Sequence, residues 1–280
     1  MIGRLRARPA LLGLGAAALV LLADGCAGGR RPDTQTPFPS PSARGYRALF
    51  RGESEGPGAK RRFRLAVAIL PPDRARLEFL GPMGGPWLVV AATAESTLAL
   101  MPGERAYERA GPSAREIDRL LGLPLEATGL VALLTGRPMC AQDAMRVEVM
   151  TRPAATFGRT LSWYRVSCPP DDIRYQARCE ERGGSLLSAT VSEGISGAMI
   201  LEVEYGGYDK GLGPRWPRQL RLRLPSKAAV IQLSAVEGPW ASDLPEAIFT
   251  PDIPEGFESR TLSLFPIGPD LPEGKAGPAN

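Results

Sequence analysis

The chain of 280 residues contains no histidine, only four cysteines and few aromatic residues, which make up 6% of the sequence. Without histidine, the chain cannot build a histidine-containing catalytic triad, a histidine-ligated metal site or imidazole acid–base catalysis. Charge of one sign is not in excess, since 34 lysines and arginines stand against 30 acidic residues. We therefore expect neither an enzyme nor a metal or cofactor site, and the near-neutral chain gives no reason to expect nucleic-acid binding.

The first 25 residues have the pattern of a secretory signal peptide. A start with three arginines precedes an apolar run from Leu11 to Ala23, and Asp24-Gly25 follows. The run of about 13 residues is shorter than the roughly 20 that a transmembrane helix needs. Cys26 comes next, and this placement resembles the lipobox of bacterial lipoproteins. The resemblance implies that cleavage removes residues 1–25 and that Cys26 carries the lipid.

Residues 26–44 are interpreted as the lipidated cysteine and a flexible tether, because Gly, Arg, Pro, Ser and Thr dominate there and cannot bury a core. Ala27 and Gly28 lack the aspartate that retains many lipoproteins in the inner membrane. By the same resemblance, this implies a lipid-anchored location at the outer membrane, facing the periplasm. Two alternatives stay open for the leader: ordinary secretion after cleavage nearby, or retention as a membrane anchor.

From residue 45 onward, apolar and polar residues alternate with a period of two, which is the pattern of strands with one buried face. Pro102-Gly103 separates two such segments and predicts a hairpin turn. Strands at this spacing predict an antiparallel sheet that curls over its apolar side. The apolar positions include Phe63, Leu65, Val67, Ile69, Leu77, Phe79, Met199, Leu201, Val203, Tyr205, Leu220, Leu222, Leu224, Ala229, Ile231 and Leu233.

One segment between the strands has helical periodicity instead. Ser113 and Glu116 have the spacing of a capping box, and the helix that they begin is predicted to end at Gly122. A second helix is predicted from about residue 126 to residue 134, before Gly136. The apolar faces of both helices need a surface to cover, and the open concave side of the sheet is the candidate.

Three segments, in the same order, resemble the LolA/LolB lipoprotein-localisation family, and more closely its outer-membrane receptor branch, LolB. They are a strand that runs into a Pro-apolar-Gly loop (Leu77–Gly84), the helical stretch Ala114–Gly136, and the string Tyr-Gly-Gly-Tyr-Asp at 205–209. Together they span about residues 46–236. The resemblance implies a mainly β (α+β) fold, an unclosed antiparallel β-barrel with a short helical lid inserted midway.

By this resemblance, an apolar cavity under the lid binds the acyl chains of client lipoproteins, which a periplasmic carrier of the LolA type delivers. The client then passes into the inner leaflet of the outer membrane, and we expect the protein to act as a monomer. A second hypothesis keeps the fold without transfer activity: a structural or interaction lipoprotein whose hollow is filled by its own side chains. Inward-pointing Phe63, Phe79, Trp163 and Trp216 would favour that hypothesis.

Met83 matches the protruding apolar loop residue that assists membrane insertion in LolB. Trp87 follows in the same turn-rich segment, and its amphipathic ring suits a membrane interface. The alternative is that both residues close a hairpin and pack on the sheet edge. Gly206-Gly207 favours a turn or bulge over a direct functional role. Candidate cavity and lid residues, which a filled core would use equally well, are Phe63, Leu65, Phe79, Ile117, Leu120, Leu130, Leu133 and Tyr205.

An insertion at about residues 138–180 departs from the family inside the predicted domain of residues 45–258. It holds the three cysteines other than Cys26. In an oxidising compartment, Cys168 and Cys179 could close a small loop and leave Cys140 over, although the sequence does not settle the pairing.

A second departure follows the last predicted strands. Phe249, Ile253 and Phe257 could dock as a further edge piece, although they lie beyond the part of the chain that resembles the family. We expect residues 259–280 to form a disordered tail.

Overall fold

The computed structural model describes residues 45–57, 59–139, 146–151, 161–168, 173–180, 185–193, 196–208 and 216–262. All of them belong to one compact unit, which spans residues 37–280. The predicted signal peptide, the lipidation site Cys26, the tether and Cys140 lie outside the described residues.

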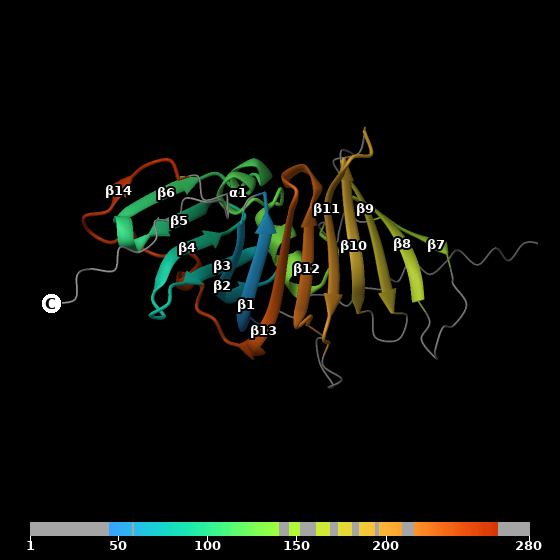
Figure 1. The fold of residues 1–280 in the computed structure, drawn as a ribbon, viewed down its shortest axis with the longest axis horizontal. Helices are drawn as coiled ribbons and strands as arrows, with labels where there is room; N and C mark the ends of the chain where they lie inside the picture. Colours follow the sequence, from blue (N-terminus) through green and yellow to red (C-terminus); the bar gives the residue numbers. More distant parts are fainter. Residues whose placement is uncertain are drawn as a thin grey trace, which may run out of the picture. The chain divides into compact units, whose positions relative to one another are not determined.

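In the described part of the chain, fourteen strands form one sheet in the order β14-β6-β5-β4-β3-β2-β1-β13-β12-β11-β10-β9-β8-β7 (Figure 1). Neighbouring strands are antiparallel, except that β14 runs parallel to β6. The end strands β14 and β7 do not pair with one another, so the sheet is unclosed, as predicted. The strands before the helices are β1 (Gly45–Gly56), β2 (Ala59–Leu70), β3 (Arg74–Leu80), β4 (Pro86–Ala92), β5 (Thr97–Met101) and β6 (Ala106–Ala110). The later strands are β7 (Arg146–Thr151), β8 (Leu161–Cys168), β9 (Ile173–Glu180), β10 (Leu186–Glu193), β11 (Met199–Gly206), β12 (Gln219–Leu224), β13 (Ala229–Ser242) and β14 (Glu258–Ser259).

The period-two pattern produces an apolar inner face and a polar outer face of the sheet. In β12, Leu220, Leu222 and Leu224 are buried, whereas Arg221 and Arg223 are exposed on the opposite side. The two arginines form ion pairs with glutamates of β11, as expected for directly opposite residues of antiparallel strands. The alternation read from the sequence is therefore confirmed, except at the start of β11, where Met199 is 41% exposed.

Two short 3-10 turns, Pro102–Glu104 (η1) and Pro225–Lys227 (η3), join β5 to β6 and β12 to β13. The hairpin predicted at Pro102-Gly103 is therefore confirmed. In each turn, the residue that follows adopts the left-handed conformation, Arg105 after η1 and Ala228 after η3.

Two α-helices, α1 (Ala114–Leu121) and α2 (Ala127–Thr135), pack their apolar residues into the same cluster as the inner face of the sheet. Both helices were predicted, and both end at a glycine in the left-handed conformation, Gly122 and Gly136. The capping box is wrong in detail. Ser113 is the N-cap residue without a side-chain cap, the Glu116 amide donates to the Ser113 carbonyl, and the Glu116 carboxylate forms an ion pair with Arg119.

Most of the predicted insertion at about 138–180 continues the sheet instead of interrupting it. The strands β9, β8 and β7 extend it outward from β10 in antiparallel register. In the β8–β9 hairpin, Cys168 lies opposite Ile173, and Cys179 lies opposite Ser162. Six residues of strand, about 20 Å, separate these two positions. A disulfide needs Cα atoms within roughly 7 Å, so this register does not bring Cys168 and Cys179 together.

A C-terminal segment, residues 243–262, crosses the outer face of the sheet, and we call it the strap. Its 3-10 turn Glu246–Phe249 (η4) is held to β3 because Arg76 donates a hydrogen bond to the Ile248 carbonyl at 2.9 Å and Arg74 pairs with Glu246 at 2.8 Å. Further along, Ile253 and Phe257 pack against a cluster of Val89, Leu98 and Leu100 on β4 and β5.

The strap differs from the predicted edge piece in two ways. Phe249 and its neighbours cover a face of the sheet, and only β14 pairs at the edge, beside β6. The predicted domain end at residue 258 is also too early, because Leu262 is buried and its backbone is hydrogen-bonded to Arg119 and Glu108. The rest of the predicted disordered tail lies outside the described residues.

Truncating the strap's buried anchor tests whether the strap is part of the folded domain. Phe249 is only 2% exposed, so Phe249→Ala is expected to lower the free energy of unfolding by about 3–5 kcal/mol. Urea denaturation followed by circular dichroism measures the loss. Glu255→Ala, at an exposed position of the same strap, is the matched control and should change stability by less than about 0.5 kcal/mol. Equal stability of both variants would show that the strap does not contribute to folding.

Candidate functional site

The inner face of the sheet and the two helices bring together the residues predicted to line a cavity. Ile117 and Leu120 of α1 meet Leu130 and Leu133 of α2 in one buried cluster, and each is at most 1% exposed. From the sheet, Leu65 and Tyr205 are buried in this cluster, and Phe63 and Phe79 pack against it half-buried. Neither helix, within the described residues, is long and apolar enough to span a membrane.

Beside Trp216, the described side chains nearly fill the space under the lid. Trp216 is 8% exposed and lies against Tyr46, with 3.7 Å between the ring centroids. The space that remains between these rings, Phe50 and Leu134 is about 10 Å³. A cavity of this size is at the limit for one water molecule, whereas ligand sites occupy roughly 300–1,000 Å³. An acyl chain therefore does not fit this space unless Trp216 shifts.

Charged contacts hold α1 on both sides. Asp118 accepts a hydrogen bond from Lys227 of the η3 turn at 2.5 Å, and Arg119 donates to the Glu108 carboxylate on β6. Arg119 also donates to the Leu262 carbonyl, and the Leu262 amide donates back to Glu108. The carboxylates of Glu108 and Glu116 raise the pKa of Arg119, so the guanidinium stays charged.

The two helices are therefore held by different forces. All of α2 except Thr128 is buried, so displacing it would expose apolar surface. The polar side chains of α1 are partly exposed, and ion pairs of this kind contribute only about 1 kcal/mol each. Of the two helices, α1 is the one whose release costs less.

The β3–β4 hairpin places Met83 in solvent and Trp87 behind it. Hydrogen bonds between the Gly81 amide and the Gly85 carbonyl, 2.8 Å, and the Gly84 amide and the Gly81 carbonyl, 3.0 Å, close the turn. Met83 is fully exposed, at 101%. Trp87 is half-buried and lies 5.7 Å from Phe79, ring centroid to centroid. The two residues thus do not share one exposed surface.

The Tyr-Gly-Gly-Tyr segment lies beside the C-terminal end of α2. Tyr205 is buried in the core, and Tyr208 donates its hydroxyl to the Leu186 carbonyl. Gly207 has a φ of +68°, and a Cβ there would lie 3.1 Å from the Cβ of Arg218. The glycines therefore have the structural role that the sequence favoured.

Burial lowers the pKa of Arg137, which follows α2 and interacts electrostatically with Tyr46.

One motif escaped the sequence analysis. Gly52-Glu53-Ser54-Glu55-Gly56 has the Gly-x-Ser-x-Gly spacing of a nucleophile elbow, which requires a strand-to-helix turn. Here Ser54 lies within β1 and is buried, and the chain holds no histidine to activate it. Gly52 makes room for an aromatic ring, because a Cβ there would lie 2.2 Å from Phe63. The string is therefore part of the sheet, without the geometry of a hydrolase.

Substitution at the end of α2 tests how tightly the lid is fitted. Gly136 has a φ of +64°, and a Cβ there would lie 2.8 Å from the Tyr208 hydroxyl. Gly136→Ala is expected to lower the free energy of unfolding by about 1–3 kcal/mol because of this strain. The matched control is Gly103→Ala, where a Cβ would meet nothing within 4 Å. Thermal and urea unfolding of both variants provide the comparison, and equal losses would contradict the fit described here.

Comparison with known proteins bears on the fold. No family model and no curated protein matches the sequence. Among solved structures, a LolA-superfamily protein from Nitrosomonas europaea aligns with a TM-score of 0.54 at 12% identity, covering 75% of this chain and 91% of that one. A putative outer membrane lipoprotein-sorting protein domain from Vibrio parahaemolyticus gives 0.55 at 11% identity over 74% and 90% of the two chains. A DUF1329 family protein from Desulfovibrio piger gives 0.58 at 11% identity over the same shares, 74% and 90%. At such low identity the likeness concerns the fold alone, and it confirms the expected architecture: the chain has the LolA-like open sheet with a helical lid.

Proposed function

We propose that this protein is an outer-membrane lipoprotein, anchored through Cys26, that binds the acyl chains of client lipoproteins under its helical lid and helps to insert them into the inner leaflet. The observation that carries the proposal is the apolar inner face covered by α1 and α2, with α1 held in part by ion pairs that are partly exposed. The likeness in fold to LolA-superfamily structures supports the same assignment.

Binding would be noncovalent and driven by transfer of the chain out of water. Each buried CH₂ contributes about 0.8 kcal/mol. Releasing α1 breaks the Asp118–Lys227 and Arg119–Glu108 pairs at about 1 kcal/mol each and also exposes Ile117 and Leu120, at about 1.5–3 kcal/mol each. An acyl chain that buries about ten methylene groups offsets this cost. Transfer from a LolA-type carrier and onward into the bilayer then requires only modest differences in affinity.

The placement of the anchor sets the geometry of delivery. The described chain begins at Gly45, which pairs with Ser242, whereas the Met83 hairpin lies at the other end of β3. About six residues of strand, roughly 20 Å, separate Gly45 from the end of β3 where the hairpin begins. Residues 27–44 can span at most about 60 Å, enough to bring Met83 to the membrane that holds Cys26. In this proposal Met83 contacts the lipid, and Trp87 stiffens the hairpin from behind.

A second candidate function is a structural or interaction lipoprotein on the same fold. The specific observation in its favour is the filled interior, in which Trp216 and Tyr46 leave about 10 Å³ under the lid. This candidate predicts that no acyl chain binds under the lid, whatever the state of α1.

The two candidates are separated by client uptake. The full-length chain is mixed with an acylated lipoprotein on a LolA-type carrier, and transfer is followed by co-purification and mass spectrometry of bound lipid. Glu108→Gln combined with Asp118→Asn removes both charged contacts of α1 and is expected to speed uptake about fivefold or more. Glu202→Gln, which breaks an outer-face pair with Arg223, is the control and should not change uptake. Absence of uptake by the native chain and by the loosened variant alike would establish the second candidate instead.

The Met83 hairpin is tested separately from binding. Met83→Glu places a charge on the fully exposed loop, so clients are expected to bind normally but to enter liposomes at least about tenfold more slowly, because a charge is costly to insert. Met199→Glu, at another exposed methionine, is the matched control and should insert clients at the native rate. Equal insertion by the native chain and Met83→Glu would remove Met83 from the mechanism.

A further inference from the structure

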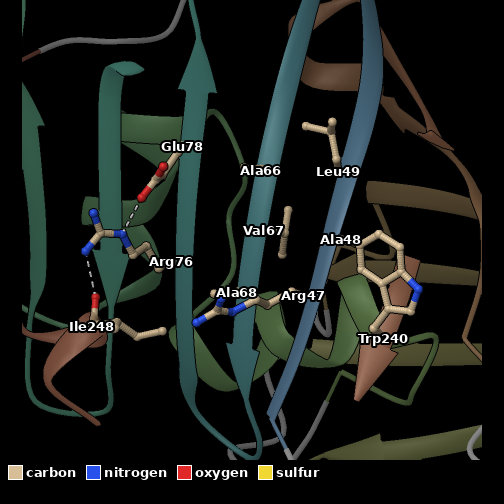
Figure 2. A pocket seen from close by; sticks show the side chains of 10 residues that line it. All are labelled: Arg47, Ala48, Leu49, Ala66, Val67, Ala68, Arg76, Glu78, Trp240 and Ile248. Atoms are coloured by element: carbon tan, nitrogen blue, oxygen red, sulfur yellow. Dashed lines mark hydrogen bonds and ion pairs between the residues drawn. The ribbon is translucent and has the colours of Figure 1, made fainter. Parts of the chain in front are cut away.

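The outer face of the sheet carries a groove that is separate from the lidded inner face. It has a volume of about 480 Å³, within the range of roughly 300–1,000 Å³ that small-molecule sites occupy. Trp240 of β13 lies on one side, and Ile248 of the strap lies on the other, with β1 and β2 between them (Figure 2). The lining residues are Arg47, Ala48, Leu49, Ala66, Val67, Ala68, Arg76, Glu78, Trp240 and Ile248.

Small side chains form the floor of this groove. On the outer side of β2, Ala66 and Ala68 stand where neighbouring positions carry arginine. Leu49 lies opposite Ala66, and Arg47 lies opposite Ala68, so one end is apolar and the other has a cation. The site thus has the composition of a ligand pocket, mostly apolar with a few polar groups that fix orientation.

One cation in the groove has no acidic partner among the described residues. Arg76 is neutralised by Glu78 at 2.7 Å and also donates to the Ile248 carbonyl, as the dashed lines of Figure 2 show. Arg47, in contrast, makes no side-chain hydrogen bond or ion pair with any described residue. One rung further along β1 and β2, Arg51 and Arg64 face one another directly, an arrangement of like charges that is unfavourable. Among the described residues, Glu237 on β13, opposite Leu49, is the one acid beside this end of the groove, so the cations Arg47, Arg51 and Arg64 outnumber it. The groove therefore lies in a net positive field that an anion would neutralise.

Trp240 is presented to the groove by a bulge in β13. Between the pairs Arg47–Trp240 and Leu49–Glu237, β13 has two residues where β1 has one. Such bulges re-aim the side chains beside them. Gly238 makes this possible, since its φ is +77° and a Cβ there would lie 2.7 Å from the Arg47 carbonyl oxygen. Trp240 is 55% exposed, although the apolar surface of the groove beside it could have buried a tryptophan side chain.

We propose that this outer groove binds an anionic amphiphile, a single alkyl chain with a carboxylate or phosphate head. The alkyl chain lies over Ala66 and Leu49 against Trp240, and the head group pairs with Arg47. Charge complementarity favours this occupant, because the lining has one uncompensated cation and no uncompensated acid. The site is independent of the lid, so it would hold for either candidate function.

The test uses the full-length chain with Cys26→Ser, so that no covalent lipid competes, and three probes below their micelle concentrations: dodecanoate, dodecanol and dodecyltrimethylammonium. Dodecanoate is expected to bind tightest and to change tryptophan fluorescence, and Trp240→Phe is expected to abolish that change. Arg47→Gln should weaken dodecanoate at least about tenfold and leave dodecanol unchanged, because it removes a charged hydrogen bond. Arg221→Gln, an outer-face arginine paired with Glu204 on β11, is the matched control and should bind like the native chain.

Three results would overturn the proposal. The first is equal dodecanoate affinity in the native chain and Arg47→Gln, with circular dichroism showing that both are folded. The second is a fluorescence change that persists in Trp240→Phe and disappears in Trp216→Phe, which would place the probe under the lid. The third is binding that occurs only after residues 37–44 are deleted, which would show that the chain's own tether fills the groove. Dodecyl phosphate in place of dodecanoate distinguishes a phosphate head from a carboxylate head.

Discussion

The apolar inner face of an unclosed sheet must be covered, and the rest of the structure follows from that constraint. A closed barrel would bury this face against itself, but here β14 and β7 stay apart within the described residues. The helices α1 and α2 supply the missing cover, and Trp216 fills the space that they leave beside Tyr46. The glycines at both helix ends and the Tyr208 hydrogen bond allow the helices to pack closely on the sheet.

The two helices are attached differently, and in the proposed function this difference allows α1 to move while α2 stays in place. Nearly all of the second helix is buried, whereas the first buries one apolar face and is otherwise attached through polar side chains that are partly exposed. The strap links this attachment to the opposite face of the sheet, because Leu262 completes the contacts of Arg119 and Glu108. The end of the strap thus contributes directly to the attachment of α1.

The sequence predicted the features that depend on local chemistry. Alternation along β2 and β12, the two helices and their glycine ends are confirmed because burial and backbone conformation are legible over a few residues. The features that were missed depend on distant partners: the strap's docking on β4 and β5 and the extension of the sheet by β7–β9. Filling of the hollow by Trp216 was left open as an alternative, because only the fold shows which way its side chain points. The outer groove escaped for the same reason, since Arg47, Ala66 and Trp240 meet only through the pairing of three strands. Even a local motif can lose to a neighbour, since the Glu116 carboxylate of the predicted capping box pairs with Arg119 and not with the start of the helix.

The pairing of β1 with β13 has a consequence for how the protein comes into being. Gly45 is opposite Ser242, so the centre of the sheet joins segments from the two ends of the domain. Contacts so distant along the chain slow folding, because the loop between them must be closed before they stabilise anything. A chain threaded across a membrane from its N-terminus, as the leader predicts, cannot complete its central ladder until its last long strand has crossed. The topology itself would thus keep the polypeptide loose during export and allow it to become compact only on the far side.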